Sequence, residues 1–321
     1  MSGLIADIGG TNVRFARVAQ DGNISDVQPM KVADYPSLVE ACEAYLATGG
    51  APEGSRPRHG AFAVASPVVG DQIKMTNHRW VFSIEETRRL LRLDTLDVVN
   101  DFAAVALGLP FLTRSDVVRI GSGEPDPHAP MAVLGAGTGL GMAGLVRPRG
   151  GGYVPLTSEG GHVTMAPFND REASVLAALR GDFQGHHVSA ERVISGPGLV
   201  NLYRAIAEVD GVTADGEITP AACTERAAAR SCPISTEAVA MFCAMLGTVA
   251  ANLALTLDAR GGIFVGGGIA PRMGDEFIAS GFRARFEDKG RFGGYLSQIP
   301  TSLITRPLPA FAGLAALVAT L

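Results

Sequence analysis

One local pattern, an apolar strand followed by a glycine-threonine turn and a second strand, occurs twice and constrains the fold more than any other feature. The first copy spans residues 4–18 around the turn Asp7-Ile8-Gly9-Gly10-Thr11-Asn12. The second spans residues 131–146 around the turn Gly135-Ala136-Gly137-Thr138-Gly139-Leu140-Gly141. The copies lie about one domain length apart, so they predict an internal duplication in a two-domain chain of 321 residues.

Strand and helix patterns alternate between and after these copies. Residues 61–65 form an apolar strand, and residues 96–99 predict another strand, which ends at Asn100-Asp101 before a helical pattern. Residues 262–265 predict a strand that leads into Gly266-Gly267-Gly268. This alternation predicts an α/β fold with a mostly parallel sheet in each domain.

The composition excludes several classes of protein. Lys and Arg together number 27 against 32 Asp and Glu, a net charge of −5 that argues against a general nucleic-acid binder. The lysines are Lys31, Lys74 and Lys289, and none of them follows a glycine, so the chain has no Walker A phosphate loop. The 4 cysteines lack the paired spacing of a zinc or redox site and predict reduced thiols in a cytosolic protein.

Two uncharged stretches need an interpretation. Residues 238–257 have the length of a membrane span, but their content of Ala, Thr, Asn and Gly favours a buried core helix. Residues 308–321 show helical spacing and predict a helix that packs on a domain surface. Because no basic and apolar leader precedes the first strand, we expect neither a signal peptide nor attachment to a membrane.

The two glycine turns are candidate phosphate-binding loops. Glycines let successive backbone N–H groups converge on an anion, and the hydroxyl of Thr11 or Thr138 adds a donor. Because lysine is scarce, we expect backbone amides and a bound Mg²⁺ to neutralise phosphate, with Asp7 binding that ion directly or through water. Taken singly, each turn is equally typical of a tight hairpin connection, and Asp7 of a turn-forming residue. The pairing of the turns favours phosphate binding.

Polar residues that could act on a ligand follow in three places. Asn100-Asp101 ends an apolar strand at the sheet edge where ligands bind in open α/β folds, which makes Asp101 a candidate general base. The same pair would suit the N-cap of the next helix. Glu159 and His162 share a glycine-rich loop and can accept from and donate to adjacent hydroxyls. Glu191 precedes a helix, where it could also be an ordinary first-turn acid.

Several segments jointly resemble the bacterial glucokinase family in order and spacing over nearly the whole chain. They are Asp7-Ile8-Gly9-Gly10-Thr11-Asn12, Met75-Thr76-Asn77-His78-Arg79-Trp80, Asn100-Asp101-Phe102, Gly135-Ala136-Gly137-Thr138-Gly139-Leu140-Gly141, Glu159-Gly160-Gly161-His162, His187-Val188-Ser189-Ala190-Glu191-Arg192, Ser195-Gly196-Pro197-Gly198-Leu199 and Phe286-Glu287-Asp288-Lys289-Gly290-Arg291. The family belongs to the actin-like ATPase superfamily. The resemblance therefore implies two actin-like (ribonuclease H-like) α/β domains with an interdomain cleft.

The resemblance also implies an activity, which is ATP-dependent phosphorylation of glucose at its 6-hydroxyl, giving glucose 6-phosphate and ADP at the start of glycolysis. It implies Asp101 as the base that faces this hydroxyl. The implied sugar contacts are Asn100, Asp101, Glu159, His162 and Glu191. The implied ATP contacts are Ala6, Asp7, Ile8, Gly9, Gly10, Thr11, Gly137, Thr138 and Gly267, with Mg²⁺ held at Asp7.

By the same resemblance we expect a small domain of residues 1–112, completed by a C-terminal helix at 308–321, and a large domain of residues 113–307. We also expect a cytoplasmic homodimer with glucose and ATP as partners and neither nucleic acid nor membrane. Zinc is not expected, because a related sugar-kinase family carries a cysteine-rich motif after its Gly-Gly-His and this chain has no cysteine there. Thr157-Ser158 stands before Glu159 where the glucokinases have Pro-Gly.

Three alternatives remain open at this point. The chain could be a kinase for another hexose, such as mannose or fructose, or one that uses polyphosphate. It could be a sugar-responsive regulator on the same fold, but such proteins usually add a DNA-binding helix-turn-helix, and this chain starts directly with its first strand. An actin-type structural ATPase is disfavoured by the sugar-binding cluster of Asn100, Glu159, His162 and Glu191.

Overall fold

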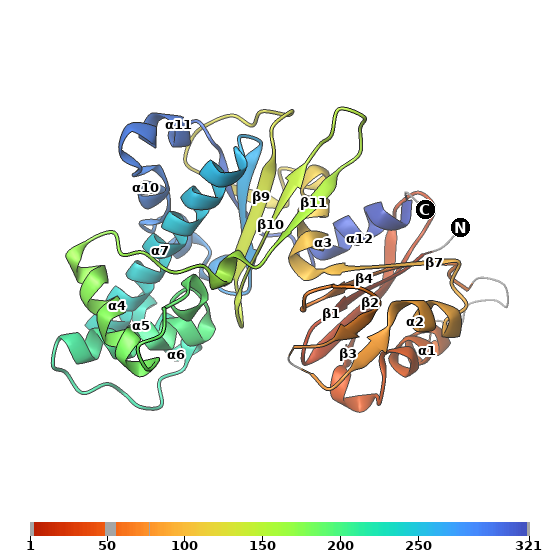
Figure 1. Ribbon diagram of the computed structural model, residues 1–321, viewed down its shortest axis with the longest axis horizontal. Helices are drawn as coiled ribbons and strands as arrows, with labels where there is room; N and C mark the ends of the chain where they lie inside the picture. Colours follow the sequence, from red (N-terminus) through yellow and green to blue (C-terminus); the bar gives the residue numbers. More distant parts are fainter. Residues whose placement is uncertain (1–2, 49–55, 77, 320–321) are drawn as a thin grey trace. The chain divides into compact units, whose positions relative to one another are not determined.

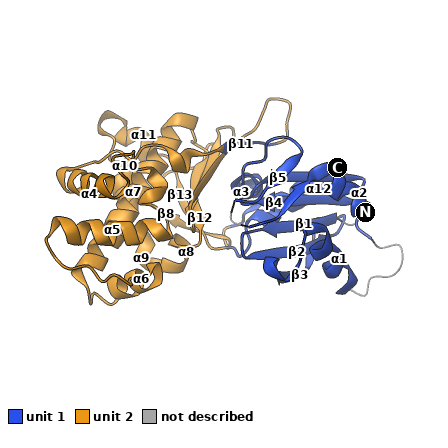
Figure 2. Ribbon diagram, turned by 60° about the horizontal axis from the view of Figure 1, so that its bottom comes forward, with its two compact units in different colours: residues 1–113, 153–157, 306–321 blue, residues 114–152, 158–305 orange. Residues whose placement is uncertain are grey.

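The structure is a computed structural model that describes residues 3–48, 56–76 and 78–319, and it divides into two compact units. Unit 1 comprises residues 1–113, 153–157 and 306–321, and unit 2 comprises residues 114–152 and 158–305 (Figure 2). Each unit contains its own sheet and its own helices. The α/β class expected from the alternating pattern is confirmed, whereas the domain bounds expected from the resemblance stay a prediction.

Unit 1 is built on a five-stranded sheet with the order β3-β2-β1-β4-β7. Its strands are β1 (Gly3–Ile8), β2 (Asn12–Val18), β3 (Ile24–Lys31), β4 (His59–Val64) and β7 (Thr95–Asn100), beside a small sheet of β5 (Gln72–Lys74) and β6 (Val81–Ser83). Its helices are α1 (Leu38–Thr48), α2 (Ile84–Leu90), α3 (Asp101–Gly108) and α12 (Ala310–Ala319), with short 3₁₀ turns at Val32–Asp34 and Leu109–Phe111.

Unit 2 is built on a six-stranded sheet with the order β11-β10-β9-β12-β13-β8. Its strands are β8 (Val117–Ile120), β9 (Met131–Ala136), β10 (Leu140–Val146), β12 (Gly262–Gly267) and β13 (Thr301–Ile304), and its edge strand is β11 (Val154–Ser158), of which residues 154–157 are counted with unit 1. Its helices are α4 (Asp170–Asp182), α5 (Gly196–Val209), α6 (Pro220–Ala228), α7 (Pro233–Leu257), α8 (Ala270–Met273), α9 (Asp275–Ile278), α10 (Phe282–Glu287) and α11 (Gly293–Ser297). Its 3₁₀ turns are η3 (Gly160–His162), η4 (Ala190–Arg192) and η5 (Gly290–Phe292).

The two sheets share one strand order, as the repeated sequence pattern predicts. In unit 1 a hairpin, β1-β2, pairs in parallel with β4, which pairs in parallel with β7. In unit 2 the hairpin β9-β10 pairs in parallel with β12, which pairs in parallel with β13. The expectation of mostly parallel sheets is wrong. Each glycine turn joins an antiparallel hairpin, because so short a connection cannot link parallel strands, so both sheets are mixed.

Both glycine turns are shorter than the sequence predicts. Asp7 and Ile8 continue strand β1, where they pair with Arg14 and Val13, and the turn begins only at Gly9. In the second copy Gly135 and Ala136 likewise continue β9, and β10 already begins at Leu140. Strands run further because a backbone inside a sheet satisfies its hydrogen bonds on both sides, which outweighs the turn propensity of Asp and Gly.

Helices cover both faces of the sheet in unit 1 (Figure 1). One face packs on α1 through residues such as Leu4, Ala6 and Ile8 of β1. The other face packs on α3 and α12 through residues such as Ile5, which lies in one buried cluster with Leu314. Because side chains alternate along a strand, Asp7 lies on the same face as Ile5, the face that α3 and α12 cover.

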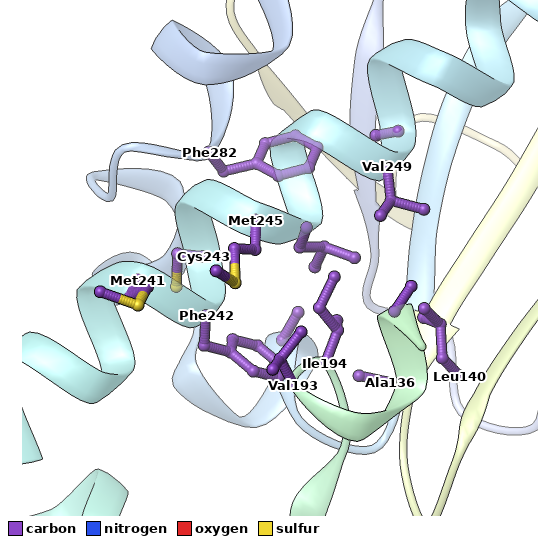
Figure 3. Packing of buried hydrophobic residues seen from close by; sticks show 14 of the residues in the cluster. Ala136, Leu140, Val193, Ile194, Met241, Phe242, Cys243, Met245, Val249 and Phe282 are labelled. Atoms are coloured by element: carbon purple, nitrogen blue, oxygen red, sulfur yellow. The ribbon is translucent and has the colours of Figure 1, made fainter. Parts of the chain in front are cut away.

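Helix α7 is the central helix of unit 2. It is long and apolar enough to cross a membrane, but 67% of its most apolar window is buried inside the protein. Figure 3 shows its residues Phe242 and Met245 in one cluster with Leu140 of β10 and with Val193 and Ile194, which follow η4. The expectation of a buried core helix is confirmed for this stretch. The same cluster includes Ala136 and Leu140 beside the second glycine turn and Ala190 beside Glu191, so it anchors these segments of unit 2.

Candidate active site

Asp101 begins α3 directly after β7, at the carboxyl edge of the parallel strands in unit 1. The side chain of Asn100 caps this helix, because its Oδ1 accepts from the amides of Phe102 at 3.0 Å and Ala103 at 3.3 Å. The N-cap interpretation of this pair is therefore correct for Asn100. It does not compete with a role for Asp101, because a capped helix holds its first residue in one place at the edge of the sheet.

The carboxyl group of Asp101 has an unusually high pKa. Burial raises this pKa to about 6, the nearby negative charge of Asp7 raises it as well, and the Phe102 amide, which donates to Oδ1 at 2.9 Å, limits the rise. Such a carboxylate is ionised at neutral pH and yet more basic than an ordinary Asp. A pKa close to the working pH is what general acid–base catalysis requires.

Asp7 faces Arg14 across the hairpin of unit 1. The two residues are register partners on β1 and β2, and Arg14 Nη1 lies 3.5 Å from Asp7 Oδ2. The side chain of Asp7 is 23% exposed and that of Arg14 is 39% exposed. Burial raises the pKa of Asp7, and the Arg14 guanidinium lowers it. Within the part of the chain that the structure describes, Arg14 is the one cationic partner of this carboxylate, so a bound cation would further stabilise its charged form.

The first glycine turn leaves backbone donors available. The Gly9 amide donates to the Asn12 carbonyl at 3.0 Å, and the Val32 amide donates to the Thr11 carbonyl at 3.0 Å. Among the described residues, the amides of Gly10 and Thr11 have no hydrogen-bond acceptor. Two unpaired N–H groups beside a partly exposed carboxylate can bind a phosphate together with its metal ion.

Ala6 and Ile8, the other predicted ATP contacts of this strand, have fully buried side chains. The Ile8 carbonyl accepts from the Ala65 amide at 3.2 Å.

The second glycine turn occupies the corresponding hairpin position in unit 2, between β9 and β10. Gly137 closes it by donating from its amide to the Gly139 carbonyl at 2.8 Å, and Thr138 at its tip is exposed. Gly267 has a φ of +81°, and a β-carbon there would overlap the Ala136 carbonyl, so only glycine lets β12 approach β9 this closely. The Gly268 amide also donates to the Ala136 carbonyl, at 2.9 Å, which places this glycine run beside the turn.

Glu191 lies against the second glycine turn. Its Oε2 accepts from the Leu140 amide at 2.9 Å, although the sequence gives no sign of this contact. The turn η4 that carries Glu191 is held in turn by Ser195, whose hydroxyl donates to the Glu191 carbonyl at 2.8 Å and caps α5. A predicted sugar contact and a predicted phosphate loop therefore meet within unit 2.

Glu159 and His162 share the short loop around η3. Their side chains are 65% and 61% exposed, and His162 Nε2 lies 4.0 Å from Glu159 Oε2. Exposed polar groups at this spacing can bind adjacent hydroxyls of one ligand. The Ser158 hydroxyl accepts from the Gly160 amide at 3.0 Å. Ser158, one of the two residues that depart from the family pattern, thus fixes the path of this loop.

A cavity of about 970 Å³ lies in unit 2, among helices α5 to α9. Apolar and polar side chains line it, including Leu199, Thr224, Arg272 and Glu276, and Gly268 borders it. This volume suits a drug-sized or nucleoside-sized ligand. Since Gly268 also bonds to Ala136, the cavity adjoins the second glycine turn. The sequence pattern indicates only the glycine border of this cavity, because its walls come from five separate helices.

Two further residues near the site were missed at the level of sequence. Arg14 could have been found from strand alternation, which places it opposite Asp7. Ser66, which follows β4 at the same sheet edge, is buried, and its hydroxyl accepts from the Thr76 amide at 2.8 Å. It thereby anchors the segment that begins at Met75, of which Asn77 lies outside the described residues.

The structure brings several predicted site residues together within each unit. In unit 1 Asp7 near the end of β1, the turn Gly9–Thr11 that follows β1, and Asn100-Asp101 at the end of β7 lie at the same edge of the sheet, where β4 separates the two parallel strands. In unit 2 the loop of Glu159 and His162, Glu191, the turn at Thr138 and the glycine run at Gly267 gather around Leu140 and Ala136.

The chain is similar to known glucokinases over nearly its whole length. The glucokinase family model matches residues 4–321. A glucokinase from Paramagnetospirillum magneticum is 52% identical over 315 residues, which cover 98% of this chain and 97% of that protein. A crystal structure of glucokinase from an Antarctic psychrotroph has a TM-score of 0.90 and 38% identity, and it covers 100% of this chain and 99% of that chain.

Another solved structure has a lower sequence identity, and its similarity supports only the shared fold. It is a ROK family glucokinase from Streptomyces griseus in complex with glucose and AMPPNP, with 20% identity, a TM-score of 0.65 and coverage of 100% of both chains. The chain spans about half the length of the bifunctional relatives that it also matches.

The paired sheets and their glycine turns define an α/β protein of the actin-like fold that sugar kinases share. Within that class the chain belongs to the glucokinase family, whose members are enzymes that phosphorylate glucose.

Proposed function

We propose that this enzyme transfers the terminal phosphoryl group of ATP to the 6-hydroxyl of glucose, with Asp101 as the general base. The observation that carries the proposal is the carboxyl group of Asp101, with a pKa of about 6 at the start of a capped helix beside Asp7. The structures of relatives support both substrates, since the Streptomyces griseus glucokinase was solved with glucose and AMPPNP.

Asp101 orients the 6-hydroxyl and takes its proton. Phosphoryl transfer proceeds through a loose transition state, so the proton leaves late and positioning contributes more than basicity. A pKa of about 6 is high enough for the carboxylate to accept this proton and low enough for it to be ionised at pH 7. The Asn100 cap supports the role, because it fixes the helix turn from which Asp101 projects.

The two glycine turns bind the phosphates of ATP. Unpaired amides at Gly10 and Thr11, and the exposed tip at Thr138, support this assignment. Asp7 fits a magnesium ion, because its carboxylate is a hard oxygen donor whose raised pKa reflects an incompletely compensated charge. When bound, Mg²⁺ supplies positive charge that offsets the charge of the phosphates. Arg14 can donate to the phosphates when Asp7 is engaged with the ion.

The cavity beside Gly268 takes the adenosine. Its volume of about 970 Å³, its mixed lining and its border with the second glycine turn support a nucleoside bound here, with its phosphates toward that turn. Glu159, His162, Glu191 and Asn100 bind the sugar hydroxyls. Their exposed or partly exposed side chains at loop positions support this role.

A coupled assay with ATP and Mg²⁺ across a panel of hexoses tests the proposal. We expect glucose to be phosphorylated with the highest kcat/KM, and 6-deoxyglucose to bind without consuming ATP. A higher kcat/KM for mannose or fructose would assign the chain to another hexose. Turnover with polyphosphate but not with ATP would reject the donor. The homodimer, the cytoplasmic location, the independence of zinc and the interdomain cleft stay predictions.

A further inference from the structure

We propose that Glu191 is a positioning residue that couples sugar binding to the second phosphate loop, residues 137–139. One oxygen of its carboxylate holds the loop, and the other accepts a hydroxyl of the sugar. This inference rests on the proposed function and deepens it, because it gives the sugar site a direct physical route to the nucleotide site within one unit.

The contact between Glu191 and the loop is close and specific. Glu191 Oε2 accepts from the Leu140 amide at 2.9 Å, directly after the loop. A β-carbon on Gly139 would overlap the same oxygen, so the loop backbone and the carboxylate are in van der Waals contact. Among the described residues, Glu191 Oε1 has no hydrogen-bond donor. The carboxylate thus has one committed oxygen and one that remains available to a ligand.

The backbone that carries Glu191 is fixed to the same loop. The Gly196 amide donates to the Gly137 carbonyl at 2.8 Å, so the start of α5 is bonded to the loop. Ser195 ties that helix start to the carbonyl of Glu191. Below these contacts, Val193 and Ile194 lie in one buried cluster with Leu140 (Figure 3). Because this frame is held on several sides, the loop and the carboxylate cannot shift independently of each other.

Leu140 also contacts the other sugar loop. A β-carbon on Gly161, between Glu159 and His162, would overlap the Leu140 carbonyl oxygen. The peptide groups of Leu140 are therefore held between the carboxylate of Glu191 on one side and the loop of η3 on the other. A sugar that binds both Glu191 and His162 therefore contacts both of the groups that hold Leu140 in place.

This arrangement has an energetic consequence. A sugar hydroxyl that donates to Oε1 orients the carboxylate and with it the bond from Oε2 to the Leu140 amide, which favours one loop geometry. By linkage, a nucleotide that favours the same geometry must strengthen sugar binding by an equal factor. A nucleotide-loop substitution that displaces Glu191 must therefore weaken sugar binding even when no nucleotide is present.

The test compares two Gly→Ala variants of unit 2 by calorimetric titration with glucose alone. Gly139→Ala pushes against Glu191 Oε2, whereas a β-carbon on the exposed Gly181 of α4 meets nothing within 4 Å. We expect Gly139→Ala to weaken glucose binding at least tenfold without nucleotide, and Gly181→Ala to change it less than twofold. Equal glucose affinity in Gly139→Ala and the wild type would overturn the proposal.

Glu191→Gln provides a second measurement, which tests the coupling even if Gly139→Ala does not fold. Glucose affinity is measured with and without AMPPNP, and the ratio of the two gives the coupling factor. Gln keeps one acceptor oxygen for two partners, so we expect its coupling factor to fall to within twofold of one. An unchanged factor would overturn the coupling role. A wild-type protein that binds no glucose would instead reject the proposed function itself.

Discussion

Asp101 at the start of α3 has a second carboxylate, that of Asp7, as its electrostatic neighbour. Burial is the larger cause of the raised pKa of Asp101, and the negative charge of Asp7 adds to it. Asp101 directly follows β7 and Asp7 is the second-last residue of β1, and these parallel strands are separated in the sheet only by β4. In the proposed mechanism one carboxylate binds the proton and the other the metal ion, and the charge of the second adds to the basicity that burial gives the first.

The pH dependence of the rate follows from this pair. The base must be ionised, so kcat/KM should fall as pH drops below about 6, the pKa of Asp101. Because the charge of Asp7 raises that pKa, Asp7→Asn should move the acid limb to lower pH, whatever it does to the maximal rate. A pH–rate series of both proteins between pH 4.5 and 8 measures this. An acid limb that stays at the same pH in Asp7→Asn would contradict the coupling of the two carboxylates.

The free energy of unfolding should also depend on the ionisation of Asp101. A carboxyl group with a raised pKa in the folded state binds its proton more tightly there than in the unfolded chain. Its favourable contribution is therefore present at low pH and is lost as pH rises from about 4 to 6. Asp101→Asn remains neutral and should be more stable than the wild type at pH 8, by on the order of 1–3 kcal/mol. The two should melt alike near pH 4.

Thermal melting at both pH values measures this difference. A variant that melts below the wild type at pH 8 would show that the ionised carboxylate is stabilised by its surroundings.

Substitution of Glu159 or His162 should weaken sugar binding and leave nucleotide binding nearly unchanged. Their side chains are mostly exposed, so truncation should leave the fold intact. We expect Glu159→Ala or His162→Ala to raise the KM for glucose at least tenfold and to change the KM for ATP by less than about twofold. His128→Ala, an exposed histidine elsewhere in unit 2, serves as the control and should leave both constants unchanged. A selective loss of ATP affinity would make the loop a nucleotide element.

Gly313 on α12 and Ala104 on α3 cross so closely that a β-carbon on Gly313 would overlap the Ala104 carbonyl. Gly313→Ala must push these helices apart, and we expect a loss of about 1–3 kcal/mol. Gly294→Ala on α11 is the matched control, since nothing lies within 4 Å of its added β-carbon. It should be neutral or stabilising. Thermal melting of both variants measures the difference. Equal melting temperatures would show that α3 and α12 can move apart without loss of stability.

The strand-turn-strand repeat predicted an internal duplication, and the two sheets do share one strand order, although both are mixed rather than mostly parallel. The end of each turn was predicted less well. Asp7 and Ile8 have turn propensity, and only the pairing of β1 with both β2 and β4 extends the strand through them. The buried nature of α7 could be read from its small and polar residues, which a membrane span would carry less often.

The roles of Asn100 and Glu191 show where sequence reasoning ends. The sequence permits two roles for Asn100, helix cap and site residue. In the structure Asn100 caps α3, and the cap helps to hold Asp101 in place. The bond from Glu191 to the Leu140 amide joins residues about fifty positions apart. No local pattern predicts such a contact, since it depends on how β10, η4 and α5 pack. The walls of the large cavity are distributed over the chain in the same way.

In the proposed mechanism Asp101 directs the phosphoryl group of ATP to the 6-hydroxyl of glucose. Carbon and phosphorus NMR of a reaction with glucose labelled with ¹³C at carbon 6 identifies the carbon that receives the phosphate. We expect ¹³C–³¹P coupling at carbon 6 in the product, one ADP per sugar, and a rate that falls by about 10²–10⁴ in Asp101→Asn. Phosphate attached at another carbon, or near-normal turnover by Asp101→Asn, would contradict this mechanism.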